Sequence, residues 1–182
     1  METDFNIRSE NDDSGDKFVE GYFIKFNEEA KIMEGMYEEV SPGSLDLSLK
    51  ENDIRCLFNH EHGMVLGRTG NQTTELRVDA KGLYGKIKIN RDDKQAMDIL
   101  ARIERGDINS CSFGFNIRKE EIQNRDDGSV KFVLKDIDLR EVSIVTFPAY
   151  PTTSIQSRTE DLEQHEKRKL EVRKAKLKEM LK

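Results

Sequence analysis

The chain has 182 residues, the usual size of one domain with short extensions. Charged residues make up 36% of it and apolar residues 35%, so part of the chain must lie outside a buried core. A net charge of −6 argues against binding nucleic acid through phosphate contacts, and no apolar run is long enough to span a membrane. The two cysteines, Cys56 and Cys111, form no metal-ligand spacing, so we expect no disulfide framework, no metal site and no cofactor.

Residues 1–16 are acidic and rich in Asn, Asp, Ser and Gly, a composition that predicts a flexible lead. They lack the positive start and apolar run of a signal peptide, so we expect a cytoplasmic protein. The predicted fold begins near Phe18, where aromatic and β-branched residues typical of a strand first gather. Residues 44–50 fit either a short helix or a strand.

Short β-type segments dominate the middle of the chain. Strands are expected at 18–26, 54–58, 64–68, 73–79, 82–90, 108–115, 117–123, 130–136 and 137–147. The clearest helix is 92–105, which carries apolar residues on one face and is followed by Gly106 as its C-cap. Many strands with one substantial helix indicate an α+β fold built on a barrel or a strongly curved sheet.

Residues 158–182 contain no Gly or Pro and are dense in charged helix formers. They predict a charged C-terminal helix that is either solvated or used for a partner or for oligomerisation, since its line of leucines is too thin for a coiled coil. The expected organisation is therefore a lead over 1–16, one domain over 17–157 and a helical tail over 158–182.

Three reactive side chains stand within or beside otherwise apolar β-segments: His60, Ser112 and Glu141. A serine hydroxyl becomes a nucleophile when a histidine removes its proton, and a carboxylate can orient that histidine. Each residue also has an ordinary structural interpretation. His62 competes with His60, and Glu141 can instead pair with Arg140 or Lys135 on a solvated face.

Strand alternation selects among the serines. In an extended segment 108–115, Ser110, Ser112 and Gly114 share one face, while Cys111, Phe113 and Phe115 share the other, which we expect to point into the core. Ser112 then stands beside a glycine that leaves room for a substrate backbone. The same rule places Glu141 and Ser143 together, opposite Val142 and Ile144. A cysteine hydrolase that uses Cys111 is disfavoured, because alternation buries that thiol.

An ordered set of motifs then narrows the class of protein. The motifs are Phe18-Val-Glu-Gly-Tyr-Phe-Ile24, Val40-Ser-Pro-Gly-Ser-Leu45, Leu57-Phe-Asn-His-Glu-His62 with Leu66-Gly67, Lys81-Gly-Leu83, Ser112-Phe-Gly-Phe115, and Leu139-Arg-Glu-Val-Ser-Ile-Val-Thr-Phe-Pro-Ala-Tyr-Pro151. In this order and spacing, over residues 18–155, the chain resembles the tailed-phage prohead maturation proteases. That family is similar to the herpesvirus assemblins.

The resemblance implies a predominantly antiparallel β-barrel with surrounding helices. It implies a serine endopeptidase with Ser112 as nucleophile, His60 as general base and Glu141 as third member, although assemblins carry a second histidine at that last position. Implied substrates are major capsid protein or scaffold segments and the enzyme itself, inside the assembling procapsid in the host bacterial cytoplasm. A homodimer or higher oligomer is also implied. The alternative from another class is a noncatalytic capsid-assembly or scaffold module on the same barrel.

Overall fold

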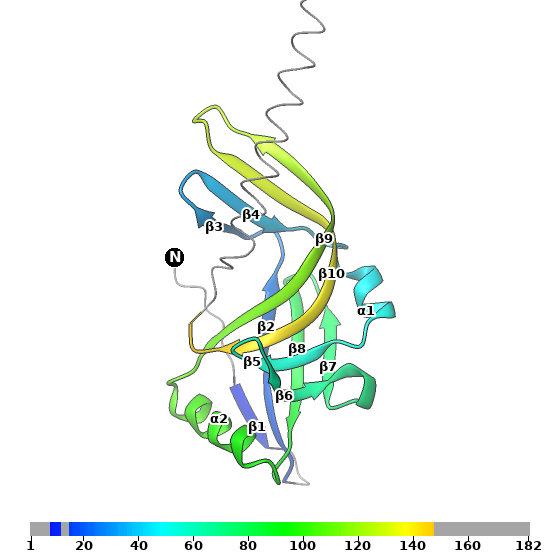
Figure 1. Cartoon of the computed structure of the whole chain (residues 1–182), viewed down its shortest axis with the longest axis vertical. Helices are drawn as coiled ribbons and strands as arrows, with labels where there is room; N and C mark the ends of the chain where they lie inside the picture. Colours follow the sequence, from blue (N-terminus) through cyan, green and yellow to red (C-terminus); the bar gives the residue numbers. More distant parts are fainter. Residues whose placement is uncertain (1–7, 12–14, 148–182) are drawn as a thin grey trace, which may run out of the picture. The chain divides into compact units, whose positions relative to one another are not determined.

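The described strands form two sheets (Figure 1). The structure is a computed structural model, and it describes residues 8–11 and 15–147. The first sheet is antiparallel, with the strand order β1-β2-β8-β7. Its strands are β1 (Arg8–Asn11), β2 (Lys17–Lys25), β7 (Thr74–Val78) and β8 (Gly82–Ile89).

The second sheet is organised around its last strand, β10 (Val130–Val145). One edge of β10 pairs with the long antiparallel strand β9, and the other edge pairs in parallel with β4 along its first part and with β5 along its last part. The hairpin partners β3 and β6 complete this sheet. Its other strands are β3 (Glu29–Met33), β4 (Met36–Val40), β5 (Arg55–Phe58), β6 (Glu61–Arg68) and β9 (Ser110–Asn124).

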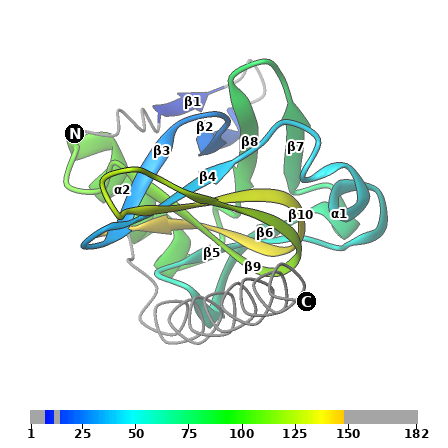
Figure 2. The ribbon, with the colours of Figure 1, turned by 90° about the horizontal axis from the view of Figure 1, so that it is seen from above.

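Two short helices and one longer helix complete the described elements: α1 (Asp46–Glu51), the 3-10 helix η1 (Thr69–Asn71) and α2 (Lys94–Arg105). α2 begins at Asp93, whose side chain accepts hydrogen bonds from two backbone N–H groups, and it ends at Gly106 in the left-handed region. α1 and α2 lie on opposite sides of the strands (Figure 2). The described residues fall within one unit, Met1–Ala149.

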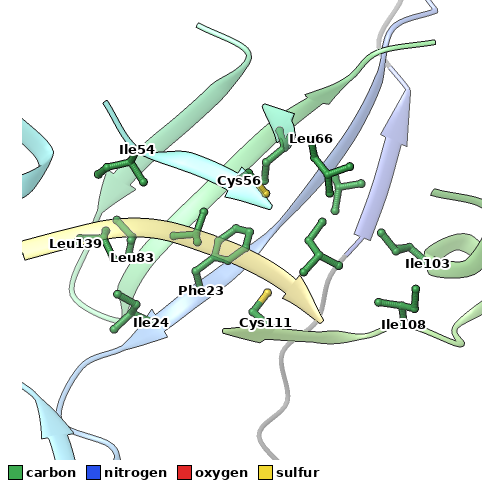
Figure 3. Close-up of a cluster of buried hydrophobic side chains, with 14 of the residues drawn as sticks. Phe23, Ile24, Ile54, Cys56, Leu66, Leu83, Ile103, Ile108, Cys111 and Leu139 are labelled. Atoms are coloured by element: carbon green, nitrogen blue, oxygen red, sulfur yellow. The ribbon is translucent and has the colours of Figure 1, made fainter. Parts of the chain in front are cut away.

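The main core lies where strands of both sheets and α2 bring their apolar faces together (Figure 3). Residues from both sheets, such as Phe23 and Leu139, meet there with Ile103 of α2. Cys56 and Cys111 are part of this cluster, and both are free and buried. Burial of such side chains is the main source of stability for a sheet that is otherwise solvated on one side.

Most of the predicted elements are present, with differences that have physical causes. Of residues 44–50, which fitted either a helix or a strand, residues 46–50 belong to the helix α1, and the predicted pairs 108–115 with 117–123 and 130–136 with 137–147 merge into the single strands β9 and β10. Register shifts along the β9–β10 pairing let these strands bend without ending. Within the segment predicted as a flexible lead, Arg8–Asn11 forms β1, which pairs through its backbone with β2.

The structure is α+β and composed mainly of strands, as predicted. The hydrogen-bonded strand order among the described residues does not close into a ring, so the predicted barrel is not confirmed. The sheets approach each other at one corner, where Phe26 forms an isolated bridge with Val40. The predicted helical tail, 158–182, lies outside the described residues.

Candidate active site

His60 lies on a two-residue turn between β5 and β6. Asn59 and His60 both have positive φ angles, 50° and 60°, and Phe58 is the register partner of Glu61. Two consecutive residues in the left-handed region are typical of the type I′ hairpin turn, whose twist matches that of the flanking strands. Glycine usually occupies the second position, so a histidine there is unusual and is held by its surroundings.

Asn59 supplies part of that support. Its backbone N–H donates to the carbonyl of Ile144 at 2.9 Å. Its side-chain Oδ1 accepts from the backbone N–H and the hydroxyl of Thr146, at 3.0 and 3.2 Å. The turn is therefore fastened to the end of β10, and asparagine also tolerates the left-handed backbone better than most residues. These hydrogen bonds set the position of the His60 turn relative to the residues of β10.

Glu141 lies on β10 and faces the His60 ring. Its Oε1 atom is 2.7 Å from His60 Nδ1. Its Oε2 atom accepts a hydrogen bond from the hydroxyl of Ser143. The Glu141 side chain is 12% exposed and the His60 side chain 33% exposed, so the pair lies at the border between the sheet interior and solvent. Both carboxylate oxygens are thus occupied.

Ser112 stands on β9, directly opposite Ser143 of β10, and Gly114 stands opposite Glu141. Opposed residues of an antiparallel pair point to the same face, so Ser112 and Glu141 share a face of the sheet. On the reverse face, Cys111 is buried, and Phe113 and Phe115 pack against the core. The alternation predicted for this segment is confirmed.

The predicted role of Gly114 needs a correction. A Cβ atom at this position would lie 2.3 Å from Oε1 of Glu141 and 3.1 Å from its Cδ. The space above Gly114 is therefore used by the Glu141 carboxylate. Room for a substrate backbone, which the sequence suggested, is not the reason that the structure gives for a glycine here.

The contact with Glu141 indicates which tautomer the His60 ring adopts. An ionised carboxylate only accepts hydrogen bonds, so the proton in the contact between His60 and Glu141 belongs to Nδ1. In a neutral imidazole, Nε2 then carries a free lone pair. Among the residues that the structure describes, Nε2 of His60 is buried and has no hydrogen-bond partner, Ser112 included. A base in this state is suited to accept a proton from a hydroxyl group.

The competing residues have other environments. His62 is exposed on β6. Arg140 pairs with Asp138 at 2.6 Å, and Lys135 lies 3.7 Å from Glu121. The solvated ladder considered for Glu141 therefore does not form with either cation.

Cys111 does not have the environment of a nucleophile. Burial raises the pKa of its thiol well above the usual range, and burial also raises the pKa of the Cys56 thiol. A thiol that resists ionisation attacks a carbonyl poorly, because the thiolate is the reactive form.

Two kinds of feature are absent from the described part of the chain. No group of three or more His, Cys, Asp or Glu side chains there could hold a metal ion. None of its helices is long and apolar enough to cross a membrane.

Sequence reasoning assigned no supporting role to Ser143 or Asn59, and the role that it gave to Gly114 was a different one. Period-two alternation did place Ser143 on the face of Glu141, and this spacing was the available signal. The contact of Gly114 with the carboxylate depends on the register of β9 against β10, which no local pattern contains.

The side chains of His60, Glu141 and Ser112 are an imidazole, a carboxylate and a hydroxyl, the three types that serine hydrolases use. They come from the turn after β5 and from the adjacent strands β10 and β9. Comparison with known proteins agrees with this class. The family model of the caudovirus prohead serine proteases matches residues 3–168, and the chain belongs to this family. The resemblance indicated by the sequence motifs is therefore confirmed.

A curated relative is the prohead protease of Enterobacteria phage HK97. It is 28% identical to this chain over an alignment of 134 residues, and the match covers 71% of this chain and 55% of the relative. The chain thus spans about half the length of that protein. No solved structure matches the chain significantly.

Proposed function

We propose that this chain is a serine endopeptidase of procapsid maturation, with Ser112 as nucleophile, His60 as general base and Glu141 as the carboxylate that orients the base. The observation that carries the proposal is the 2.7 Å contact between His60 Nδ1 and Glu141, which leaves Nε2 buried without a described partner. Membership of the prohead serine protease family supports the same reaction.

The proposed reaction is acyl transfer. The Ser112 oxygen attacks the carbonyl carbon of a peptide bond while Nε2 of His60 takes the hydroxyl proton. As the tetrahedral intermediate collapses, the C–N bond breaks and His60 returns the proton to the leaving amine. A water molecule, deprotonated by His60, then attacks the ester on Ser112, and the bond to Ser112 breaks as His60 passes that proton to the Ser112 oxygen. Glu141 holds the ring in place and stabilises the imidazolium at each step.

The proposed substrates are segments of the major capsid protein or of a scaffold, together with the enzyme's own chain. The HK97 relative is named a prohead protease, which supports this choice and a location inside the assembling procapsid in the host bacterial cytoplasm. Self-association into a homodimer or higher oligomer belongs to the same proposal.

A fluorophosphonate probe tests the proposed nucleophile without knowledge of the substrate. Wild-type protein, Ser112→Ala and His60→Ala are exposed to the probe at high protein concentration, and adducts are measured by intact mass. We expect one adduct on the wild type and none on either variant. An unmodified wild type with intact circular dichroism would favour a noncatalytic assembly module.

The substrate class is tested separately. The chain is coexpressed with the capsid protein of its phage, and the capsid protein is analysed by mass spectrometry. Defined fragments that disappear in Ser112→Ala are expected, and identical fragment patterns for both forms would contradict the proposed substrate.

A further inference from the structure

Ser143 is the most deeply buried hydroxyl near the candidate site. Its relative exposure is 0%, and its neighbours along β10, Val142, Ile144 and Val145, are buried as well. A buried hydroxyl without a partner is unfavourable, because it loses its hydrogen bonds to water, so a serine here requires a hydrogen bond. The structure gives it one partner, Oε2 of Glu141.

This hydrogen bond constrains the carboxylate that faces His60. Rotation of the Glu141 carboxylate about its last torsion is broad and weakly restricted in an isolated side chain. Here Oε2 is held by Ser143 and Oε1 lies on His60 Nδ1, so a rotation by a quarter turn would break both contacts. Ser143 therefore fixes the plane in which the carboxylate meets the imidazole.

The packing against β9 also restricts the position of the Glu141 carboxylate. Gly114, opposite Glu141, leaves the carboxylate space, and a Cβ atom there would overlap Oε1. Ser112, opposite Ser143, stands on the same face of the sheet. The Ser143 hydroxyl thus contacts one oxygen of the Glu141 carboxylate, while His60 contacts the other.

We propose that Ser143 is a positioning residue, which acts on the reaction only through Glu141 by holding its carboxylate against His60. This inference rests on the proposed function. It predicts that loss of the Ser143 hydroxyl slows the activation of Ser112 without altering the nucleophile or the base.

The test measures the rate of fluorophosphonate labelling at Ser112, by intact mass, in a double-mutant cycle. A hydrogen bond to a charged group of this kind predicts labelling about 10- to 100-fold slower in Ser143→Ala than in the wild type. In a Glu141→Gln background, the same Ser143→Ala change is expected to slow labelling by about threefold at most, because the charged partner is already gone.

Ser48→Ala is the matched control. Ser48 is also 0% exposed, but its hydroxyl bonds only to the β10 backbone, donating to Ile137 at 2.5 Å and accepting from Leu139 at 3.0 Å. Its removal should lower stability and leave the labelling rate of folded protein within about twofold of wild type. A structural readout accompanies the rates: the Nδ1 proton resonance of His60 should move in Ser143→Ala and stay in place in Ser48→Ala.

The outcomes separate the two proposals. A wild type that is never labelled overturns the proposed function, and this inference with it. A labelled wild type together with Ser143→Ala at the wild-type rate overturns only the positioning role. Equal slowing by Ser143→Ala in the wild-type and Glu141→Gln backgrounds, or an unmoved His60 resonance, also overturns it, because either result indicates a general effect on packing.

Discussion

Gly114→Ala is the most direct perturbation of the candidate site that leaves all its polar residues in place. The new Cβ would lie 2.3 Å from Oε1 of Glu141, whereas ordinary contact begins at 3.4 Å. The carboxylate, or the strand beneath it, must therefore shift by about 1 Å. A misplacement of this size at a reacting group can reduce the rate by about 100-fold, which corresponds to about 2.7 kcal/mol.

The same variant should also have a lower free energy of unfolding, although glycine-to-alanine changes in strands usually raise it. Alanine in a strand is normally more favourable than glycine, by about 0.5–1 kcal/mol. Here the overlap costs about 1–3 kcal/mol, so we expect a net loss of stability in urea unfolding. Because the overlap is local, the folded variant should keep the circular dichroism spectrum of the wild type. Its main defect should be a lower rate of fluorophosphonate labelling.

Gly63→Ala is the matched control for this experiment. Gly63 also lies in a strand, β6, next to the turn that carries His60, but a Cβ atom there has no neighbour within 4 Å. Its labelling rate should equal that of the wild type. If Gly114→Ala were also labelled at the wild-type rate, the packing of Glu141 against Gly114 would be refuted as a requirement of the site.

Three further predictions concern the turn, the thiols and an acidic group. Asn59→Ala should lower the free energy of unfolding by about 2–3 kcal/mol and Asn59→Gly by about 1 kcal/mol, measured in urea, because glycine keeps the left-handed backbone and loses only the side-chain hydrogen bonds. Cys56 and Cys111 should resist iodoacetamide at pH 8 in native protein and react in denaturant, since burial raises both pKa values; rapid native labelling would contradict this. The hydrogen bond from the side-chain amide of Asn52 lowers the pKa of Asp138 below its usual value, so this carboxylate stabilises the native state above about pH 4 and loses that effect as pH falls. In urea unfolding measured at several pH values, the free energy of unfolding of Asp138→Asn should therefore fall less steeply below about pH 4 than that of the wild type.

Local patterns predicted the parts of the fold that depend on local physics. The predicted C-cap of α2, Gly106, directly follows the helix in sequence, and period-two alternation correctly grouped Ser112 with Gly114 and Glu141 with Ser143. The strands β3 and β4 escaped prediction because they are short and rich in charge, and their pairing depends on β10. Short charged strands of this kind carry a weak apolar signal and are read as loops.

His60 and His62 could not be distinguished by local sequence patterns. Both residues follow the same buried strand, and the sequence alone offers no difference in chemistry. The two side chains differ in the structure, since the left-handed backbone at 59–60 turns His60 towards Glu141 of β10, while His62 continues into β6. A contact between residues 81 positions apart depends on tertiary structure, so only the resemblance to a family favoured His60 beforehand.

The central position of β10 has a consequence for synthesis of the protein. Its register partners on β4 and β5 leave the ribosome long before it does, and they have no neighbour on that side until residues 130–145 emerge. Pairing across such a large sequence separation is slow to form. A nascent chain that already contains His60 and Ser112 therefore still lacks Glu141 and the strand end that fastens Asn59. The proposed protease would remain latent until nearly all of its described sequence had been translated.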